Sequence, residues 1–511
     1  MKQDNTQPNK TMNNIATSAL AWGFPVLLGF IFTPFILKYI GKDAYGIQVL
    51  IISVAGYLAL LDFGLNGAGT KYLAEFNAQK DIKSIQDLLG TTLTAYTILG
   101  FIGALVIWFI SPWLCVSVFS VPNLLVNESI SAFRIGGLGF FLSMITWWYT
   151  AIPTGLQRFD IFNWISIAFG VLNTVGNFLA AYLGYGLIGI IISGIVANII
   201  AIILYAIYTR KILVSVKIRY SFKWYMFKKT MSFGIYMIVF SFFAIIFAQL
   251  DKTIIGIMLG TTVLTYYVIP LSVSSINQQV NGKIMQILFP KASEIYALYD
   301  IHRLKSLFKR SFNMSVIVGL LISIPLITFS FPILKFWISI DMAMHAHFTM
   351  IILVAAFFLA GIIPYSIITG MGFPKYYTYS SIISGVCGLI FYLLLIKPFG
   401  AGGAAAAKLI SILMTVFFYI YISRKHLDIK AVDLMKIAYP TISIACIIGI
   451  SFYFISDFIS NLFYLFLFSS IADIIFITFV WILGIVNEEE KQKILVFLRI
   501  KTVIERNTKN K

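Results

Sequence analysis

The sequence predicts an all-α integral membrane protein, and two observations lead to this fold class. Of its 511 residues, 59% are hydrophobic and only 11% are charged, whereas about a quarter of the residues in soluble domains are charged. The apolar residues also gather in runs of about 20, the length that a helix needs to cross roughly 30 Å of hydrocarbon. Because a helix satisfies its own backbone hydrogen bonds, these runs are expected to cross the bilayer as helices.

Fourteen such runs predict about 14 transmembrane helices. The first six cover residues 15–40, 46–66, 88–112, 133–154, 161–183 and 187–208. The next six cover 230–250, 263–289, 312–336, 347–370, 377–397 and 401–423, and a last pair covers 437–456 and 461–486. The predicted organisation is an N-lobe (1–208), a basic cytoplasmic linker (209–229), a C-lobe (230–424), a C-terminal helix pair (437–486) and a cytoplasmic tail (487–511).

The two groups of six spans repeat each other weakly. Gly41-Lys42-Asp43-Ala44-Tyr45 has its match in Gly260-Thr261-Thr262-Val263-Leu264, Gly155-Leu156-Gln157-Arg158 in Gly372-Phe373-Pro374-Lys375, and Tyr185-Gly186-Leu187-Ile188-Gly189 in Phe399-Gly400-Ala401-Gly402-Gly403. The members of the three pairs lie 219, 217 and 214 residues apart. Two related six-helix halves are a common way to build a carrier that binds its substrate between them. The repeat therefore favours a transporter.

Basic residues predict the orientation, because Lys and Arg in short loops stay on the cytoplasmic side. With both termini inside, the tails and the inner loops carry 31 of the 38 Lys and Arg residues. The net charge of +18 is then explained by topology and by anionic lipid headgroups, not by nucleic-acid binding. The linker between the halves is expected to be a solvated inner loop.

Three basic residues within or near the spans are candidates to line a substrate cavity. Arg134 and Lys252 mark outer ends of spans, and Lys408 lies about 10 Å down the twelfth span at 1.5 Å per residue. Charges at such depth cost about 2.5–3.5 kcal/mol on insertion scales. They would suit an anionic cargo that needs countercharge in a low dielectric. Snorkelling to the interface is the alternative for Arg134 and Lys408.

Three acidic residues in the spans are candidates for a gate or an ion-coupling site: Asp62, Asp251 and Asp473. Asp62 could instead cap a helix or pair with Lys71, and Asp251 could form a structural pair with its neighbour Lys252. Asp473 lies near the middle of the fourteenth span, where it is expected to face protein or water.

Other motifs carry no chemistry. Asp62-Phe63-Gly64 matches the magnesium motif of kinases, but no glycine-rich or catalytic loop accompanies it. His345 and His347 have no carboxylate or cysteine nearby in their loop that would complete a metal site. We therefore expect no metal, no cofactor and no catalytic residues.

Five motifs occur in the order seen in bacterial polysaccharide flippases. They are Leu61-Asp62-Phe63-Gly64-Leu65 with Lys71-Tyr72, Gly155-Leu156-Gln157-Arg158-Phe159-Asp160, Gln249-Leu250-Asp251-Lys252-Thr253-Ile254-Ile255-Gly256 with Leu259-Gly260, Leu288-Phe289-Pro290-Lys291, and Gly370-Met371-Gly372-Phe373-Pro374-Lys375. On these motifs the chain resembles Wzx-type O-antigen or polysaccharide flippases of the multidrug, oligosaccharidyl-lipid and polysaccharide exporter superfamily. Lys71, Arg158 and Lys375 are the basic residues of these motifs on the expected cytoplasmic side.

The resemblance implies two pseudo-twofold-related six-helix lobes around a cavity that opens alternately to each side. It implies an undecaprenyl-pyrophosphate-linked oligosaccharide as cargo, moved across the bacterial plasma membrane for surface polysaccharide biosynthesis. A polysaccharide polymerase and a chain-length regulator are candidate partners, and H⁺ or Na⁺ is the candidate coupling ion. Fourteen spans, rather than the twelve of many sugar flippases, resemble the flippases of lipid-linked peptidoglycan precursors.

Two other functions stay open. An ion-coupled exporter of a drug or metabolite would have the same fold, although the first span contains no Asp or Glu, which weighs against a cation-coupled drug exporter. A membrane enzyme such as a polysaccharide polymerase is the other, and the short outer loops and the duplication both argue against it.

Overall fold

Every element in the described part of the chain is a helix. The computed structural model describes residues 7–214, 216–486 and 491, with the side chains of residues 7–22, 233–241, 244, 287 and 457 outside this description. The predicted cytoplasmic tail (487–511) lies outside the described residues apart from Lys491, and so do the first six residues of the chain.

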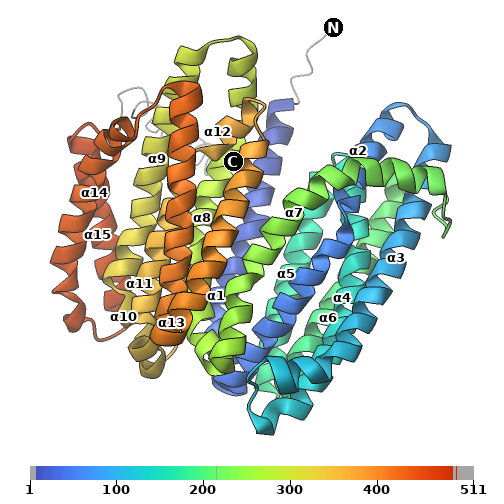
Figure 1. Ribbon diagram of the computed structural model, residues 1–511, viewed down its shortest axis with the longest axis horizontal. Helices are drawn as coiled ribbons and strands as arrows, with labels where there is room; N and C mark the ends of the chain where they lie inside the picture. The colour runs from blue at the N-terminus through green and yellow to red at the C-terminus, as the bar shows by residue number, and fades with distance from the viewer. Residues whose placement is uncertain (1–6, 215, 487–490, 492–511) are drawn as a thin grey trace, which may run out of the picture. The chain divides into compact units, whose positions relative to one another are not determined.

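The helices follow one another with short connections (Figure 1). The first group is α1 (Gln7–Leu58), η1 (Ala59–Asp62), α2 (Leu65–Ala78), α3 (Ile82–Trp113), η2 (Leu114–Val118), η3 (Asn123–Leu125), α4 (Val126–Gly155), α5 (Phe159–Tyr182) and α6 (Gly186–Ile212). The second is α7 (Trp224–Met258), α8 (Gly260–Ala297), α9 (Ile301–Thr328), α10 (Ser330–Trp337), α11 (Ile340–Ile362), α12 (Tyr365–Gly370) and α13 (Lys375–Leu427). The last is α14 (Ala431–Tyr453), η4 (Ser456–Phe458) and α15 (Leu462–Ile482).

The helices agree with a chain that crosses the membrane many times. Among the described residues, ten helical segments are long and apolar enough to span a bilayer. Two of them cover two predicted spans each: 23–62 covers most of 15–40 and 46–66, and 375–427 contains 377–397 and 401–423. In each, the two spans are joined across a non-helical residue, Gly41 or Gly400. The predicted seventh and eighth spans lie on α7 and α8. The observed helices are therefore compatible with fourteen spans.

The chain divides into two compact units. Unit 1 contains residues 1–268 and 388–404, and unit 2 contains residues 269–387 and 405–511. In unit 1, α3, α4, α5 and α6 run alongside one another (Figure 1). In unit 2, α9 packs against α11, α14 and α15. The predicted lobes, 1–208 and 230–424, stay a proposal about how the halves of the sequence relate.

Positive-φ glycines and helix N-caps recur in the structure at the spacing of the sequence repeat. Gly41 and Gly260, 219 residues apart, have φ of 80° and 84°, a region that glycine enters without strain. At the same spacing, Asp81 and Asp300 are the N-caps of α3 and α9, and their carboxylates accept backbone hydrogen bonds of 3.0 and 2.8 Å from Ser84 and Arg303. Hydrogen bonds from Ser84 also lower the pKa of Asp81, which keeps this cap ionised.

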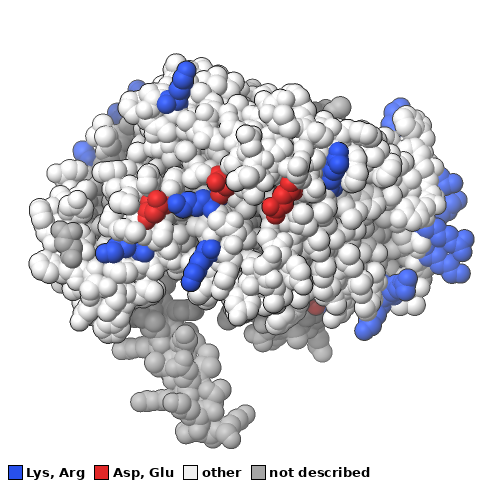
Figure 2. All heavy atoms as spheres, turned by 90° about the horizontal axis from the view of Figure 1, so that it is seen from below, with Lys and Arg blue, Asp and Glu red and all other residues white. Residues whose placement is uncertain are grey.

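Apolar side chains cover the outside of the helices as well as the core. In unit 1, Ile36, Ala180 and Ile190 form a buried cluster against which Phe32 and Phe178 pack, while Phe109 is 74% exposed. Charged side chains are sparse on the face drawn in Figure 2, most of which is uncharged. Exposed apolar surface on this scale is typical of a protein whose solvent is lipid.

The basic linker is docked against α3. The backbone N–H of Lys223 donates to the Thr91 hydroxyl at 3.2 Å, and the Thr94 hydroxyl donates to the carbonyl of Ser221 at 3.4 Å. A β-carbon at Gly90 would collide with the Ser221 side chain and lie 2.7 Å from the carbonyl oxygen of Arg219. The linker exposes Lys217, Arg219 and Lys223 as expected, but its backbone is held to the first half.

Candidate functional site

The second predicted span is broken inside unit 1. The helix that contains Leu58 gives way to the short η1, and Phe63 and Gly64 then adopt left-handed backbone conformations with φ of 47° and 71° before α2 begins. Gly64 takes this conformation readily, whereas Phe63 does so at a cost. Broken helices within a membrane are tolerated where the freed backbone groups find partners or line a cavity. The break is therefore a candidate site.

Asp62 lies at this break and its carboxylate meets hydrogen-bond donors. Its Oδ1 accepts from the backbone N–H of Asn66 at 3.3 Å and from the hydroxyl of Tyr96 on α3. The Tyr96 side chain is 1% exposed. A carboxylate at the start of α2 also interacts favourably with the helix dipole. These contacts place the Asp62 carboxylate next to the first turn of α2, and its roles as a gate or a coupling site stay predictions.

Neutral polar side chains extend the site from α2 to α4. The amide of Asn66 donates to the carbonyl of Trp147 at 2.7 Å and to the Thr150 hydroxyl at 3.0 Å. One turn further along α2, the hydroxyls of Thr70 and Thr154 lie 3.2 Å apart. The sequence reasoning missed these partners because they lie far from Asp62 in the chain and carry no charge.

Asp251 lies in a second polar site of unit 1 and is completely buried. Its Oδ2 accepts a 2.8 Å hydrogen bond from the Tyr267 hydroxyl, and its Oδ1 accepts one from the backbone N–H of Lys252 at 2.8 Å. Close by on α7, the Thr253 hydroxyl lies 2.9 Å from that of Tyr57. The Lys252 ammonium donates to the Gln249 side chain at 3.0 Å.

The other two predicted cavity bases have aromatic neighbours. The Arg134 guanidinium on α4 lies 5.0 Å from the ring centroid of Trp108 on α3, and its Nε is buried with no hydrogen-bond partner in the described part of the chain. The Lys408 ammonium on α13 lies 5.8 Å from the ring centroid of Phe357 on α11. Such cation–π contacts stabilise a charge where water is scarce.

Asp473 is half-buried on α15, in unit 2. Its Oδ1 is buried and has no hydrogen-bond partner among the described residues. Asp473 thus faces protein with at least one of its oxygens, as the sequence predicted for a carboxyl in mid-span. Asp62, Asp251 and Asp473 occupy three different surroundings.

The three basic residues of the sequence motifs are exposed. Arg158 and Lys375 lie at the starts of α5 and α13, and Lys71 lies in the middle of α2. Arg158 forms a two-fold hydrogen-bonded pair with Asp160, with Nε and Nη2 each 2.9 Å from a carboxylate oxygen. Lys71 lies 4.7 Å from the ring centroid of Tyr72, and Lys375 lies 5.6 Å from that of Tyr376.

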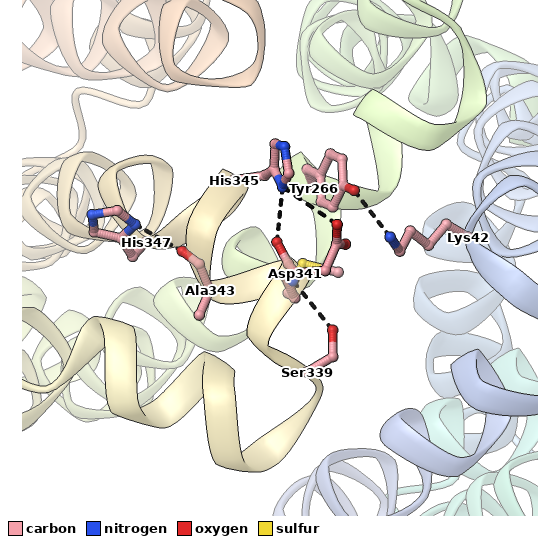
Figure 3. A network of polar contacts seen from close by, with 8 residues as sticks. Lys42, Tyr266, Ser339, Asp341, Ala343, His345 and His347 are labelled. Carbon is pink, nitrogen blue, oxygen red and sulfur yellow. Dashed lines mark hydrogen bonds and ion pairs between the residues drawn. The ribbon is translucent and has the colours of Figure 1, made fainter.

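The equivalent segments of the two repeats meet inside unit 1. Asp43 Oδ1 accepts hydrogen bonds from the hydroxyls of Thr261 at 2.6 Å and Thr262 at 2.5 Å. The Lys42 ammonium donates to the Tyr266 hydroxyl at 3.0 Å (Figure 3). The sequence carried a signal for this contact, since these segments are the ones matched by the repeat, but it did not indicate that they touch. We call residues 41–46 and 260–266 the repeat junction.

His345 and His347 do not share a ligand. Their Nδ1 atoms lie 2.9 Å from the carbonyl of Asp341 and 2.7 Å from that of Ala343 respectively, and the two rings point away from each other on α11 (Figure 3). Residues two apart on a helix face different directions. Among the described residues, no group of three or more His, Cys, Asp or Glu side chains could hold a metal.

Comparisons with known proteins show which family and which proteins this chain is similar to. A sequence model described as "Polysaccharide biosynthesis protein" matches residues 38–341. A protein of Shigella flexneri named "Putative O-antigen transporter" is 22% identical over 414 residues, which cover 79% of this chain and 95% of that protein.

Two solved structures share the fold. The lipid II flippase MurJ in an inward closed conformation has a TM-score of 0.72 at 15% identity, over 91% of this chain and 98% of that one. An inward-facing multidrug resistance MATE family transporter of the MOP superfamily has a TM-score of 0.68 at 12% identity, over 80% of this chain and 98% of that one.

These findings confirm the predicted all-α membrane fold and the resemblance to polysaccharide exporters. The relatives carry the names of transporters and flippases, in agreement with the prediction that the chain is not an enzyme. The match to the family model covers more than half of the sequence, and so this multi-pass membrane protein belongs to the family of polysaccharide biosynthesis proteins.

Proposed function

We propose that the chain is a flippase that moves undecaprenyl-pyrophosphate-linked oligosaccharide units across the plasma membrane by alternating access. The observation that carries this proposal is the family match over residues 38–341. The likeness to a named O-antigen transporter over 95% of that protein's length supports it. Sugar and pyrophosphate cannot cross hydrocarbon unaided because unpaired polar groups lose several kcal/mol each there, on the order of 2–7.

Arg134, Lys252 and Lys408 are the residues that we propose to counter the pyrophosphate or acidic sugars of the cargo. Lys408 has the strongest support, because it is half-buried within a helix that has a membrane-spanning composition. An ammonium at that depth interacts strongly with phosphate because the surrounding dielectric is low. Asp62, Asp251 and Asp473 are proposed to gate the path or to couple transport to an ion.

The orientation follows from the basic loops. We propose that both termini and the motif residues Lys71, Arg158 and Lys375 lie on the cytoplasmic side, where anionic headgroups would meet them. The lipid tail of the cargo would stay in the bilayer. A polymerase and a chain-length regulator would use the delivered units outside.

Deletion of the chain in its own host tests this function. We expect surface polysaccharide to disappear and completed undecaprenyl-linked units to accumulate on the cytoplasmic leaflet. Complementation with the intact chain should restore the polymer. Unchanged polymer would contradict a flippase, and units that reach the outer leaflet without being polymerised would point to a polymerase.

A small-molecule exporter is the second candidate, favoured by the likeness to the multidrug transporter at a TM-score of 0.68. The two functions differ in whether movement of the cargo requires a polyprenyl carrier. Sensitivity of the deletion strain to toxic small molecules, with normal surface polysaccharide, would favour the exporter.

A further inference from the structure

We propose that Asp62 and Tyr96 form the site where this transporter binds its coupling proton. The proposal rests on the transport function above and deepens it, because it names the ion and its site. Asp62 lies at the break in the second predicted span, and its carboxylate is hydrogen-bonded to the buried Tyr96. Among the described residues, this is the only break in a predicted span with such a pair. Intramembrane carboxyls of this kind are costly unless they serve a function.

The repeat supplies an internal comparison for this site. At the spacing of 219 residues that relates Gly41 to Gly260 and Asp81 to Asp300, the counterparts of Asp62 and Tyr96 are Asn281 and Ser315. The second half therefore has a neutral amide where the first half has a carboxyl.

The backbone differs in the same place. Residues 278–283, the counterparts of 59–64, lie inside the continuous helix α8, whereas the first half breaks at Phe63 and Gly64. Asn281 is completely buried and donates to Asn277 on its own helix. The carboxyl and the helix break thus occur together in one half and are both absent from the equivalent segment of the other. A purely structural requirement of the fold would apply to both halves.

The donors around Asp62 favour a proton over a metal cation. The Tyr96 hydroxyl and the backbone N–H of Asn66 both donate to Oδ1. A metal cation needs oxygen lone pairs, and hydrogen-bond donors compete for those of Asp62. A proton needs only one lone pair of a carboxylate oxygen. Its binding forms one O–H bond and changes no other covalent bond. When Asp62 is protonated, the Tyr96 oxygen can accept in place of donating.

The elements packed around Asp62 present few other charges. Tyr96 on α3 is its titratable neighbour, and Trp147 and Thr150 on α4 are neutral members of the same network. On α7, which packs against η1, the charged residues Asp251 and Lys252 precede Thr253, whose hydroxyl lies 2.9 Å from that of Tyr57. Asp251 accepts a hydrogen bond from Tyr267, and Lys252 donates one to Gln249.

A change at the break would alter the proton affinity of Asp62. The hydrogen bonds that the Tyr96 hydroxyl and the backbone N–H of Asn66 donate to Asp62 stabilise the charged form of its carboxyl group relative to the neutral form, because hydrogen bonds to the charged form favour that form. A movement of the start of α2 would remove the Asn66 donor and favour uptake of a proton. Proton binding and the conformation of α2 are thereby coupled.

Asp62→Asn separates a coupling role from a capping role. Asparagine caps helices about as well as aspartate but binds no proton, and it reproduces the residue at the equivalent position of the second half. Asp81→Asn, at the N-cap of α3, is the matched control.

Two measurements on the full-length protein decide the matter. The first is uptake, into proteoliposomes with and without a pH gradient, of lipid-linked units extracted from a deletion strain. One coupled proton changes the accumulation ratio by at most about tenfold per pH unit. We expect wild type and Asp81→Asn to respond to the gradient and Asp62→Asn to lose the response while transport down the cargo gradient persists. A retained response in Asp62→Asn would overturn the proposal.

The second measurement needs no cargo. Infrared difference spectra across a pH titration record the carbonyl stretch of protonated carboxyl groups, and the band of Asp62 is expected to be missing in Asp62→Asn and perturbed in Tyr96→Phe. Identical spectra for wild type and Asp62→Asn would overturn the proton site. If wild type moves no lipid-linked units, the proposed cargo fails while this spectrum still decides whether Asp62 takes up a proton.

Discussion

The carboxylate of Asp43 accepts a 2.6 Å hydrogen bond from the hydroxyl of Thr261, and so corresponding segments of the two repeats bind each other. Close packing reinforces the contact, because Gly46 is buried against the backbone of Thr261. Further along α1, a β-carbon at Gly56 would lie 2.8 Å from the side chain of Gln249 on α7. The repeat junction is therefore both polar and tightly packed.

Removing the polar part of the junction is expected to weaken it. Asp43→Ala should destabilise the contact by about 1.5–3 kcal/mol, the usual worth of hydrogen bonds to a charged group. Thr261→Val should have a smaller effect, because Thr262 still donates to Asp43, and Thr261→Ser should restore the wild-type value. Thermal unfolding in detergent measures the difference, and equal melting temperatures for Asp43→Ala and wild type would contradict it.

Filling the packed part should destabilise this conformation. Gly46→Ala places a methyl group against the carbonyl of Thr261, and overpacking of this kind costs about 1–3 kcal/mol. Gly29→Ala is the control on the same helix, because a β-carbon there has no neighbour within 4 Å. We expect a spin label at the exposed position 39 to show greater separation from one at the exposed position 257 in Gly46→Ala but not in Gly29→Ala. Equal distances would show that the junction accommodates the methyl group.

Replacing Lys408 should reduce transport without unfolding the protein. Lys408→Ala removes the ammonium over Phe357 and should lower surface glycan at an unchanged protein level. Lys335→Ala removes a similar cation–π contact, at 5.1 Å from the ring of Phe336, and is expected to leave the glycan unchanged. If both variants behave like wild type, Lys408 does not line the substrate path.

Installing a carboxyl in the second half tests the asymmetry of the repeat. Asn281 is completely buried and its amide nitrogen donates to Asn277, so Asn281→Asp should destabilise the fold by about 1–3 kcal/mol through lost donation and burial of an acid. The loss should be larger at pH 8 than at pH 5, because a carboxyl that is buried without donors favours its protonated form. A pH-independent loss would contradict this account.

The sequence predicted the membrane fold because apolar length and charge bias are local properties. Gly41 and Gly400 were recognised at span boundaries, and both have non-helical backbone in the structure. The break at Phe63 and Gly64 was not predicted, because the apolar run continues through it. A hydropathy profile contains no information about the backbone angle φ.

The candidate sites were only partly predictable. Intramembrane charge identified Asp62 and Asp251, but their partners Tyr96 and Tyr267 are tyrosines that the sequence gave no reason to separate from the other aromatic residues. The burial of Asp251 was also missed, because its adjacent lysine suggested an interface. Partners across helices depend on tertiary packing, which a single sequence does not record.

The docking of the linker on α3 bears on how the two halves are joined. Arg219 and Ser221 lie close against Gly90, so that the linker packs as part of the first half of the chain. A second half moved to another protein without residues 219–223 would lack the contacts with Thr91 and Thr94 that anchor the segment leading into α7.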